Sequence, residues 1–347
     1  MIFESLPTTP RSEELVDKAF SRASRTGRAK SGREAQEAML RTAANILADN
    51  LENVVTAWPD FGSDDETVLL PRDEREDLVD PFYYELADAI LKMESETFRD
   101  EGGVDALRMS LSELSWASNQ IRELRSEYQG KMRKTDADTA RKHRKQAFAR
   151  FADILDEIED DLLRVGAARD ALRDLPEIRP DEPAIVVAGY PNVGKSSFVN
   201  RVTRASNEIA SYPFTTRGVQ LGHFERDRIR YQIIDTPGLL DRPAEDRNAI
   251  ERQAVSALTH LADAVVFVVD ASGDCGYPVD SQLELRDEVE RLFEAPVITV
   301  CNKADRSRDV EADAYMSVTE GEGVDDVLER AVLAVGYEPD IPPSRRE

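Results

Sequence analysis

Residues 184–199 read AIVVAGYPNVGKSSFV, and this stretch decides the fold of the second half of the chain. Its first apolar, mostly β-branched residues predict a buried strand that ends before Gly189. The following spacing Gly-x-x-x-x-Gly-Lys-Ser is typical of a phosphate-binding loop that leads into a helix. Glycines let backbone N–H groups surround a phosphate, and the helix directs its positive dipole end at the same anion. A glycine-rich turn without a ligand is the simpler alternative.

Each polar residue of this loop has an expected role. The Lys195 ammonium should reach the β- and γ-phosphates of a nucleotide, and the Ser196 hydroxyl should ligate Mg²⁺. The predicted phosphate-binding residues of the loop are Gly189, Asn192, Val193, Gly194, Lys195, Ser196 and Ser197.

A second motif, Asp235-Thr236-Pro237-Gly238, follows the apolar run YQIID. We expect Asp235 to bind Mg²⁺ through water and the Gly238 N–H to meet the γ-phosphate. A plain Asp-x-Pro-Gly turn is the alternative. Upstream, the segment YPFTT supplies two hydroxyls, and we expect Thr216 to complete the Mg²⁺ shell, with Thr215 as the adjacent alternative. The predicted switch residues are Thr215, Thr216, Asp235, Gly238 and Leu239.

A third motif, Asn302-Lys303-Ala304-Asp305, follows the apolar run PVITV. The Asp305 carboxylate can accept hydrogen bonds from guanine N1–H and the exocyclic amine, a pair that adenine does not offer. We expect Asn302 and Lys303 to tie the base loop to the phosphate loop, and Ser317 and Val318 to contact guanine O6 through the backbone. The three motifs in this order predict a GTPase that binds GTP and GDP with Mg²⁺.

Two residues bear on the rate of hydrolysis. Leu239 stands where small regulatory GTPases carry a water-orienting glutamine, and a leucine side chain cannot orient water. In related GTPases, an asparagine at the place of Asn192 helps to hold K⁺. We therefore expect slow intrinsic hydrolysis unless K⁺ or a large partner completes the site.

Composition limits the class of protein. The chain has 347 residues, enough for two domains, and a net charge of −24. We interpret this acidity as adaptation to high intracellular salt, although it would ordinarily repel nucleic acid and membranes. No apolar run is long enough to span a membrane and the N-terminus has no secretory pattern, so no membrane partner is expected. Two distant cysteines, Cys275 and Cys301, fit a reducing, cytoplasmic location.

The hydrophobic pattern predicts an all-α helical bundle domain over residues 1–175, a proline-rich linker over 176–183, a GTPase domain over 184–336 and a short tail over 337–347. Apolar stripes predict bundle helices at 13–25, 34–57, 81–92, 104–131 and 142–165. The GTPase domain should be a doubly wound α/β fold with a mostly parallel sheet and one antiparallel hairpin. Its strands are expected at 184–188, 220–224, 229–235, 264–270, 297–302 and 314–317. Its helices are expected at 196–203, 248–261, 279–293 and 324–335.

One part of the helical half departs from the overall acidity. Residues 122–150 are rich in arginine and lysine, a pattern that fits contact with a phosphate backbone. A solvated face that pairs with acidic neighbours is an equal alternative. The candidate RNA contacts are Arg133, Lys134, Arg141, Lys142, Arg144 and Lys145.

Three long segments carry a closer resemblance: AGYPNVGKSSFVNRVTRA, ASYPFTTRGVQLGHFE and YQIIDTPGLLDRPAEDRNAIERQAVSAL. Together with DASGDCGYPVDSQ and the early SEELVDKAFSRASR, they resemble the Obg-like GTPases, within them the nucleolar GTP-binding (Nog) branch. The resemblance implies an archaeal, halophilic source and a role in large ribosomal subunit assembly, with the helical domain contacting rRNA. It also implies binding to the large-subunit precursor, and we expect a monomer off the ribosome. The sequence SVT replaces the family's usual SAK or SAL, and functions of the long C-terminal extension of eukaryotic members are not carried over.

Two other functions are considered. The chain could be an rRNA-binding scaffold with negligible turnover, or an Obg-type regulator of translation and stress. The second is disfavoured because the glycine-rich N-terminal domain of Obg has no counterpart here.

Overall fold

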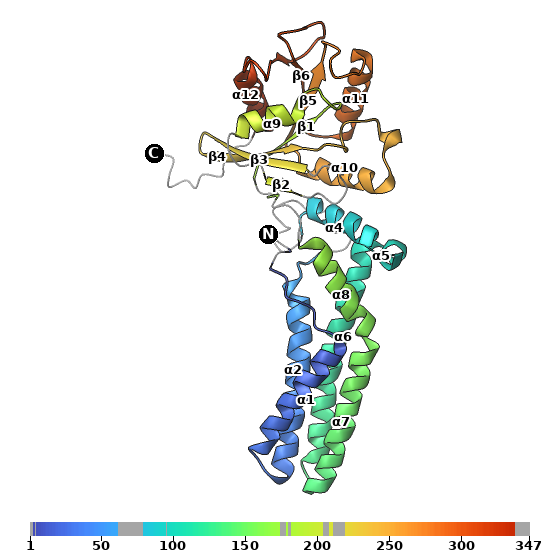
Figure 1. Cartoon of the computed structure of the whole chain (residues 1–347). Coiled ribbons are helices and arrows are strands. Elements are labelled where there is room, and N and C mark those ends of the chain that lie inside the picture. Colours follow the sequence, from blue (N-terminus) through green and yellow to red (C-terminus); the bar gives the residue numbers. More distant parts are fainter. Residues whose placement is uncertain are drawn as a thin grey trace. The chain divides into compact units, whose positions relative to one another are not determined.

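The computed structural model describes residues 3, 5–61, 79–94, 96–173, 178–179, 182–203, 208–210 and 219–336 (Figure 1). The chain divides into two compact units, one of Met1–Val79 with Ile90–Asp174 and one of Asp80–Ala89 with Leu175–Glu347. Within the described residues, no helix is both long enough and apolar enough to cross a membrane.

The first unit is the expected helical bundle. Helix α2 packs along both α1 and α6, and α7 packs on α2 and α6 (Figure 1). Its core consists of small and branched apolar side chains, among them the fully buried Leu47, Leu51 and Leu114. The helices are α1 (Ser12–Arg28), α2 (Gly32–Ala57), α4 (Pro81–Glu94), α5 (Glu96–Glu101), α6 (Gly103–Met132), α7 (Ala137–Glu157) and α8 (Glu159–Leu172).

The prediction of a single helix at 142–165 is wrong in two respects: the helix begins earlier, and it is divided into α7 and α8. Asp136 caps the N-terminus of α7 by accepting the Thr139 N–H at 2.8 Å, so the helix begins five residues earlier. The helix then breaks at Ile158, whose φ of −99° and ψ of 15° are not helical, and α8 follows. The short helix α5 was also not expected. Most of the expected connector at 59–80 lies outside the described residues.

The helical domain expected over residues 1–175 differs from the first unit in one segment. Asp80–Ala89, which includes the first half of α4, belongs to the second unit. There the Tyr83 hydroxyl donates to the main-chain carbonyl of Ile178, and both residues are buried. An aromatic side chain with a satisfied hydroxyl is a favourable anchor, and this bond ties the segment to the rest of the second unit.

The second unit contains a seven-stranded sheet with strand order β2-β3-β4-β1-β5-β6-β7. Strands β4, β1, β5, β6 and β7 run parallel to one another, while β3 is antiparallel to both β4 and β2. The doubly wound, mostly parallel fold with one antiparallel hairpin, β3–β4, is thus confirmed, and β2 is an additional strand. The strands are β1 (Ala184–Ala188), β2 (Glu208–Ala210), β3 (Val219–Arg226), β4 (Ile229–Asp235), β5 (Ala264–Asp270), β6 (Val297–Asn302) and β7 (Ala314–Tyr315).

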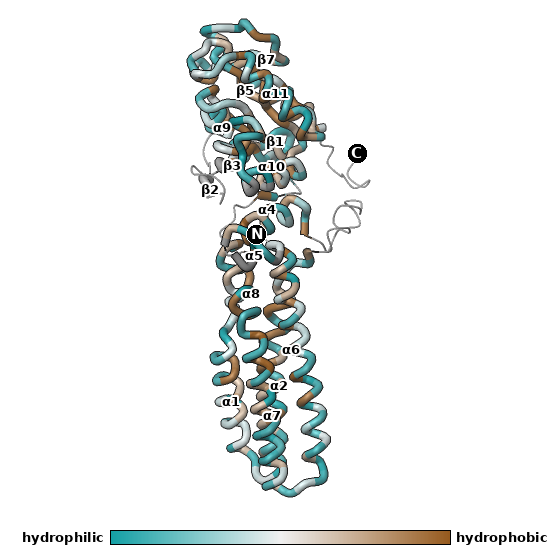
Figure 2. The backbone as a smooth tube through the Cα atoms, turned by 90° about the vertical axis from the view of Figure 1, so that its right-hand side faces the viewer, coloured by the Kyte–Doolittle hydropathy of each residue, from teal (hydrophilic) through white to brown (hydrophobic). Residues whose placement is uncertain are grey.

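Helices cover both faces of this sheet. Helices α9 (Lys195–Thr203) and α12 (Val324–Val335) lie side by side on one face, and α10 (Ala249–Leu261) and α11 (Val279–Leu292) cover the other (Figure 1). Every residue of β1 and β5 is buried, and both strands lie within the brown, apolar interior of the trace in Figure 2. This burial on both faces explains their continuous apolar sequences. The strand expected at 314–317 is shorter, because Ser317 instead forms an isolated bridge with Glu322.

Candidate functional site

The phosphate-binding loop connects β1 to α9 and needs its glycines. Gly189 and Gly194 have φ values of +130° and +108°. A Cβ atom at Gly189 would lie 2.4 Å from the carbonyl oxygen of Val268, and one at Gly194 would lie 2.1 Å from the Asn302 side-chain amide. Asn192 is exposed and also has a positive φ, +64°. The local backbone therefore has the turned-in form that the motif predicts.

Lys195 points back into this loop. Its Nζ donates to the carbonyl oxygens of Gly189 at 2.7 Å and Tyr190 at 2.9 Å, and the residue is 7% exposed. Burial lowers the pKa of Lys195, while the nearby carboxylates of Asp235 and Asp241 oppose that shift. A buried ammonium between a loop of backbone amides and two carboxylates is well placed to attract a phosphate.

Asp235 lies at the end of β4 beside the first turn of α9. The Ser196 hydroxyl donates to Asp235 Oδ2, and among the described residues no group donates to the buried Oδ1. Burial raises the pKa of Asp235, which the hydrogen bond from Ser196 and the charge of Lys195 partly offset. A carboxylate oxygen without a partner, next to a hydroxyl, fits a hard cation such as Mg²⁺.

Asp235 and Ser196 offer two oxygen ligands to such a cation, and Mg²⁺ would take its remaining ligands from water and from a nucleotide. Within the described residues, no group of three or more His, Cys, Asp or Glu side chains is arranged to hold a metal. Thr215 and Thr216 lie outside the described residues, so their switch and metal roles stay predictions.

The segment after β4 turns sharply at Gly238. The Leu239 N–H donates to the Thr236 carbonyl at 3.2 Å, and the Leu239 side chain is fully buried. The Gly238 N–H itself donates to Asp241 Oδ2 at 2.8 Å. Leu239 is thus a packing residue in this structure, and its expected failure to orient the attacking water stays a prediction.

Asn302 joins the base loop to the phosphate loop as expected. Its side-chain amide donates to the Val193 carbonyl at 2.8 Å, and its Oδ1 accepts the Val318 N–H at 3.2 Å. Ser317 is buried beside them, whereas the Asp305 side chain is 34% exposed. One buried side chain thus joins the phosphate loop, the Asn302–Asp305 motif and the predicted guanine-binding segment at Val318.

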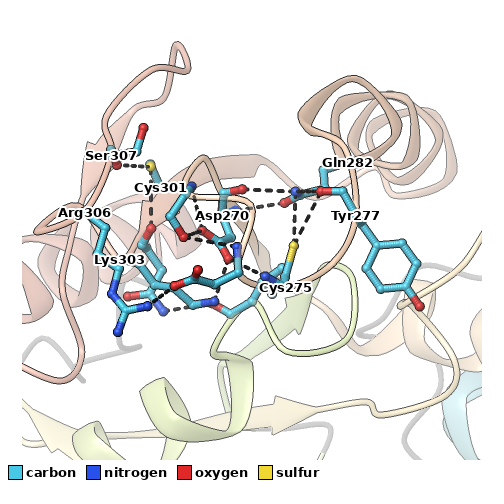
Figure 3. Close-up of polar contacts among 12 residues, drawn as sticks. Asp270, Cys275, Tyr277, Gln282, Cys301, Lys303, Arg306 and Ser307 are labelled. Atoms are coloured by element: carbon cyan, nitrogen blue, oxygen red, sulfur yellow. Dashed lines mark hydrogen bonds and ion pairs between the residues drawn. The ribbon is translucent and has the colours of Figure 1, made fainter.

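The expected tie from Lys303 to the phosphate loop is wrong. Lys303 Nζ instead pairs with Asp270 Oδ2 at 2.5 Å (Figure 3). The Asp270 side chain is fully buried at the end of β5, and a buried carboxylate is costly without a cationic partner. Burial alone would raise the pKa of Asp270, but hydrogen bonds from Lys303 and Ser272 outweigh it and hold the pKa below its ordinary value.

Two buried residues beside the candidate site, Asp270 and Gln282, were not singled out from the sequence. The buried Gln282 side chain accepts the Asp270 N–H at 2.8 Å and donates to the Tyr277 carbonyl at 2.9 Å. Together they shape the loop 270–277 (Figure 3). The Tyr277 ring in turn packs on Tyr190, with ring centroids 4.4 Å apart. The signal that could have found Asp270 is its place at the carboxyl end of the apolar run AVVFVVD, as with Asp235.

The six basic residues predicted to contact RNA lie near the turn between α6 and α7. Five of the six candidate RNA contacts are exposed, and the sixth, Arg144, is half-buried over the Phe148 ring. In the described residues none of the six has an ion pair. The exposed ones are Arg133, Lys134, Arg141, Lys142 and Lys145.

A second basic turn lies beside this one. Arg33, at the start of α2, donates through Nη1 to the Arg133 carbonyl at 2.7 Å. This contact joins the α1–α2 turn, with exposed Arg25 and Arg28, to the α6–α7 turn at one end of the bundle. Figures 1 and 2 show both turns at that end. We name the exposed cations of the two turns the basic end, formed by Arg25, Arg28, Arg33, Arg133, Lys134, Arg141, Lys142 and Lys145.

Comparison with known proteins gives two family matches. A model of the NOG1 N-terminal helical domain matches residues 3–66 and 71–179, and a nucleolar GTP-binding protein 1 (NOG1) model matches residues 249–305. The uncharacterized protein MJ1408 of Methanocaldococcus jannaschii is 36% identical over 313 residues, which cover 87% of this chain and 81% of that protein. The nucleolar GTP-binding protein 1 of Arabidopsis thaliana is 40% identical over 203 residues, 58% of this chain and 30% of that protein.

A solved Plasmodium falciparum structure assigned to nucleolar GTP-binding protein 1 is 33% identical, with a TM-score of 0.43, and the match covers 47% of this chain and 90% of that one. The present chain spans less than half the length of the eukaryotic relatives, 30% of the Arabidopsis protein and 42% of the Caenorhabditis elegans protein.

Proposed function

Because the chain belongs to the nucleolar GTP-binding protein 1 family, we propose that it binds GTP and GDP, hydrolyses GTP and acts as a switch in large ribosomal subunit assembly. The observation that carries the nucleotide part is the convergence of Lys195, Ser196 and Asp235 at one end of the sheet. Asn302 connects this phosphate end to the predicted guanine-binding segments. Asp305, partly exposed in the same loop, is the residue that we assign to recognition of guanine.

We assign Mg²⁺ to Ser196 and Asp235, with Thr216 as the third predicted protein group. The metal would neutralise charge on the β- and γ-phosphates. The protein contributes a buried Lys195 and fixed backbone amides, which need no rearrangement when charge develops on the phosphate oxygens.

Intrinsic hydrolysis should be slow because the buried Leu239 supplies no group that orients the attacking water. We propose that K⁺, held with the help of Asn192, compensates in part. Asn192 supports this idea because it is exposed on the phosphate loop with a backbone φ of +64°. A large partner that completes the site is the other source of activation.

The partner that we propose is the large-subunit precursor, bound through rRNA by the basic end. A group of exposed cations of which only Arg33, with Glu37, has an ion pair among the described residues is unusual on a chain with a net charge of −24. Cations of this kind attract a phosphate backbone. We propose that this protein is a cytoplasmic member of the family and a monomer off the ribosome.

The test is GTP hydrolysis at high KCl or high NaCl, with and without large-subunit precursors, with Lys195→Ala as the inactive control. We expect the rate to rise with K⁺ and rise further with the particles. Equal rates of hydrolysis in KCl and NaCl would contradict the proposal that K⁺ stimulates hydrolysis. A rate that stays at the Lys195→Ala background in every condition would favour the scaffold function, for which the buried Leu239 is the supporting observation.

A further inference from the structure

The Gly238 N–H, which the motif assigns to the γ-phosphate, already has an acceptor within the chain. Asp241 lies three residues later, and its Oδ2 accepts this N–H at 2.8 Å. Gly238 has a φ of +88°, and this turn brings the two residues together. One peptide N–H makes one strong hydrogen bond, so the Asp241 carboxylate and a γ-phosphate oxygen cannot both accept it at full strength.

The charge of Asp241 acts on the same two groups that should hold the triphosphate. Its carboxylate is close enough to interact electrostatically with the Lys195 ammonium and with the Asp235 carboxylate. Asp241 therefore lies within electrostatic reach of both the phosphate-binding lysine and the predicted metal ligand. A γ-phosphate between these groups would face a like charge at short range, which is unfavourable in a partly buried site.

We propose that Asp241 competes with the γ-phosphate for the Gly238 N–H and thereby makes the protein favour GDP over GTP. This inference rests on the proposed function, since it concerns the same nucleotide site. GDP has no γ-phosphate, so it leaves the contact between Asp241 and Gly238 in place. GTP must break that contact and move the carboxylate away before its own oxygen can bind.

The contacts around Asp241 show which residues would move with it. Glu288 on α11 contacts two residues that follow Asp241. Its Oε2 accepts the Ala244 N–H at 3.1 Å, and its Oε1 lies 3.1 Å from Nη1 of the buried Arg247. Arg242 links the other end of the segment to Gly238, whose carbonyl accepts its Nη2 at 3.2 Å. Asp241 thus lies on a segment that is held at Gly238 by Arg242 and at Ala244 and Arg247 by Glu288.

The competing explanation is that Asp241 only closes a local turn. In that case its removal would change the stability of the protein and leave the choice between GDP and GTP unchanged. A charged acceptor on an N–H group is worth about 10-fold to 100-fold in an equilibrium constant, so the two explanations differ measurably.

The test is the affinity of the full chain for fluorescent GDP and for a fluorescent, non-hydrolysable GTP analogue, both with Mg²⁺. The variants are Asp241→Asn, which keeps an acceptor without charge, and Asp241→Ala, which removes the acceptor. Glu245→Gln is the matched control, because Glu245 is an exposed carboxylate on the same segment. Thermal unfolding of each variant establishes that it is folded.

We expect Asp241→Asn and Asp241→Ala to bind the GTP analogue about 10-fold or more tightly than the wild type, with GDP affinity within about twofold. Glu245→Gln should match the wild type for both nucleotides. Equal changes for GDP and the analogue, or no change, would overturn the inference while leaving the proposed function intact. Failure of the wild type to bind either nucleotide would overturn the proposed function and this inference together. Unchanged affinities with slower hydrolysis would make Asp241 a residue of the chemical step and also overturn the inference.

Discussion

The side-chain amide of Asn302 donates to the main-chain carbonyl of Val193 at 2.8 Å, across 109 residues of sequence. The same side chain accepts the Val318 N–H at 3.2 Å. Asn302 is 4% exposed, so water cannot replace these bonds. The phosphate loop and the predicted base loop therefore hold their relative positions through one side chain.

We predict that Asn302→Ala destabilises the protein by about 1–3 kcal/mol, because it leaves the buried Val193 carbonyl and Val318 N–H without partners. It should also weaken GDP binding, since both loops lose their common support. Chemical denaturation and GDP titration measure the two effects. Asn119→Ala, at an exposed position on α6, is the control and should change neither. A stable Asn302→Ala variant with wild-type GDP affinity would contradict the structural role.

Asp235 leads to a prediction with a defined dependence on pH. Burial raises its pKa in the folded protein, so the folded state favours the protonated acid. The contribution of this site to the free energy of unfolding is fully present below the ordinary aspartate pKa of about 3.9. It is lost as the pH rises through the higher pKa that Asp235 has in the folded state. Without nucleotide or Mg²⁺, Asp235→Asn should therefore be more stable than the wild type at pH 7, by about 1–3 kcal/mol.

The measurement is denaturation of both proteins from pH 4 to pH 8 in the presence of a chelator. The stability difference should be small at pH 4 and grow toward pH 7. If the unfolding free energies of the two proteins changed in parallel with pH, burial would not destabilise the charged form of Asp235. In the presence of Mg²⁺ and GTP, the same variant should bind more weakly, because it loses a metal ligand.

The sequence predicted much of this site because strand ends and glycine spacing are local features. The strands β1, β4, β5 and β6 begin and end at the expected residues, since continuous apolar runs mark strands that are buried on both faces. The partner of Lys303 could not be predicted this way. Its choice of Asp270 depends on two parallel strands being neighbours, and sequence order does not specify that adjacency.

The break at Ile158 was also beyond the sequence. The apolar stripe continues across it, with Ile154, Leu155, Ile158 and Leu162 all buried, so periodicity alone indicates one helix. Packing of α8 on α6 is a tertiary effect that overrides the local pattern.

Glu288 should be important for the segment that follows Gly238. It pairs with Arg247, whose side chain is 2% exposed, while its own side chain is 25% exposed. Glu288→Gln would leave a buried guanidinium without its counter-charge, and we expect a loss of about 2–3 kcal/mol, below the usual cost for a fully buried pair. Glu284→Gln, an exposed position one turn earlier on α11, should leave stability unchanged. Thermal and chemical denaturation measure the difference, and equal stabilities of the two variants would contradict this role.

The basic end gives a prediction about the proposed partner. Reversing Arg141, Lys142 and Lys145 to glutamate should weaken co-sedimentation with large-subunit precursors by about 10-fold or more at moderate salt, because each cation that contacts a phosphate contributes through counterion release. The wild-type interaction should weaken steeply as KCl rises, and the variant should show a shallower salt dependence. The control reverses Lys18, Arg22 and Arg99, three exposed cations elsewhere on the helical unit.

GDP affinity should stay unchanged in both triple variants, since the reversed residues lie in the unit that holds none of the nucleotide motifs. If both triple variants lose the particles equally, the attraction is a general effect of charge and the basic end is not the contact. If neither loses them, these cations form a solvated face and the particle binds elsewhere on the chain.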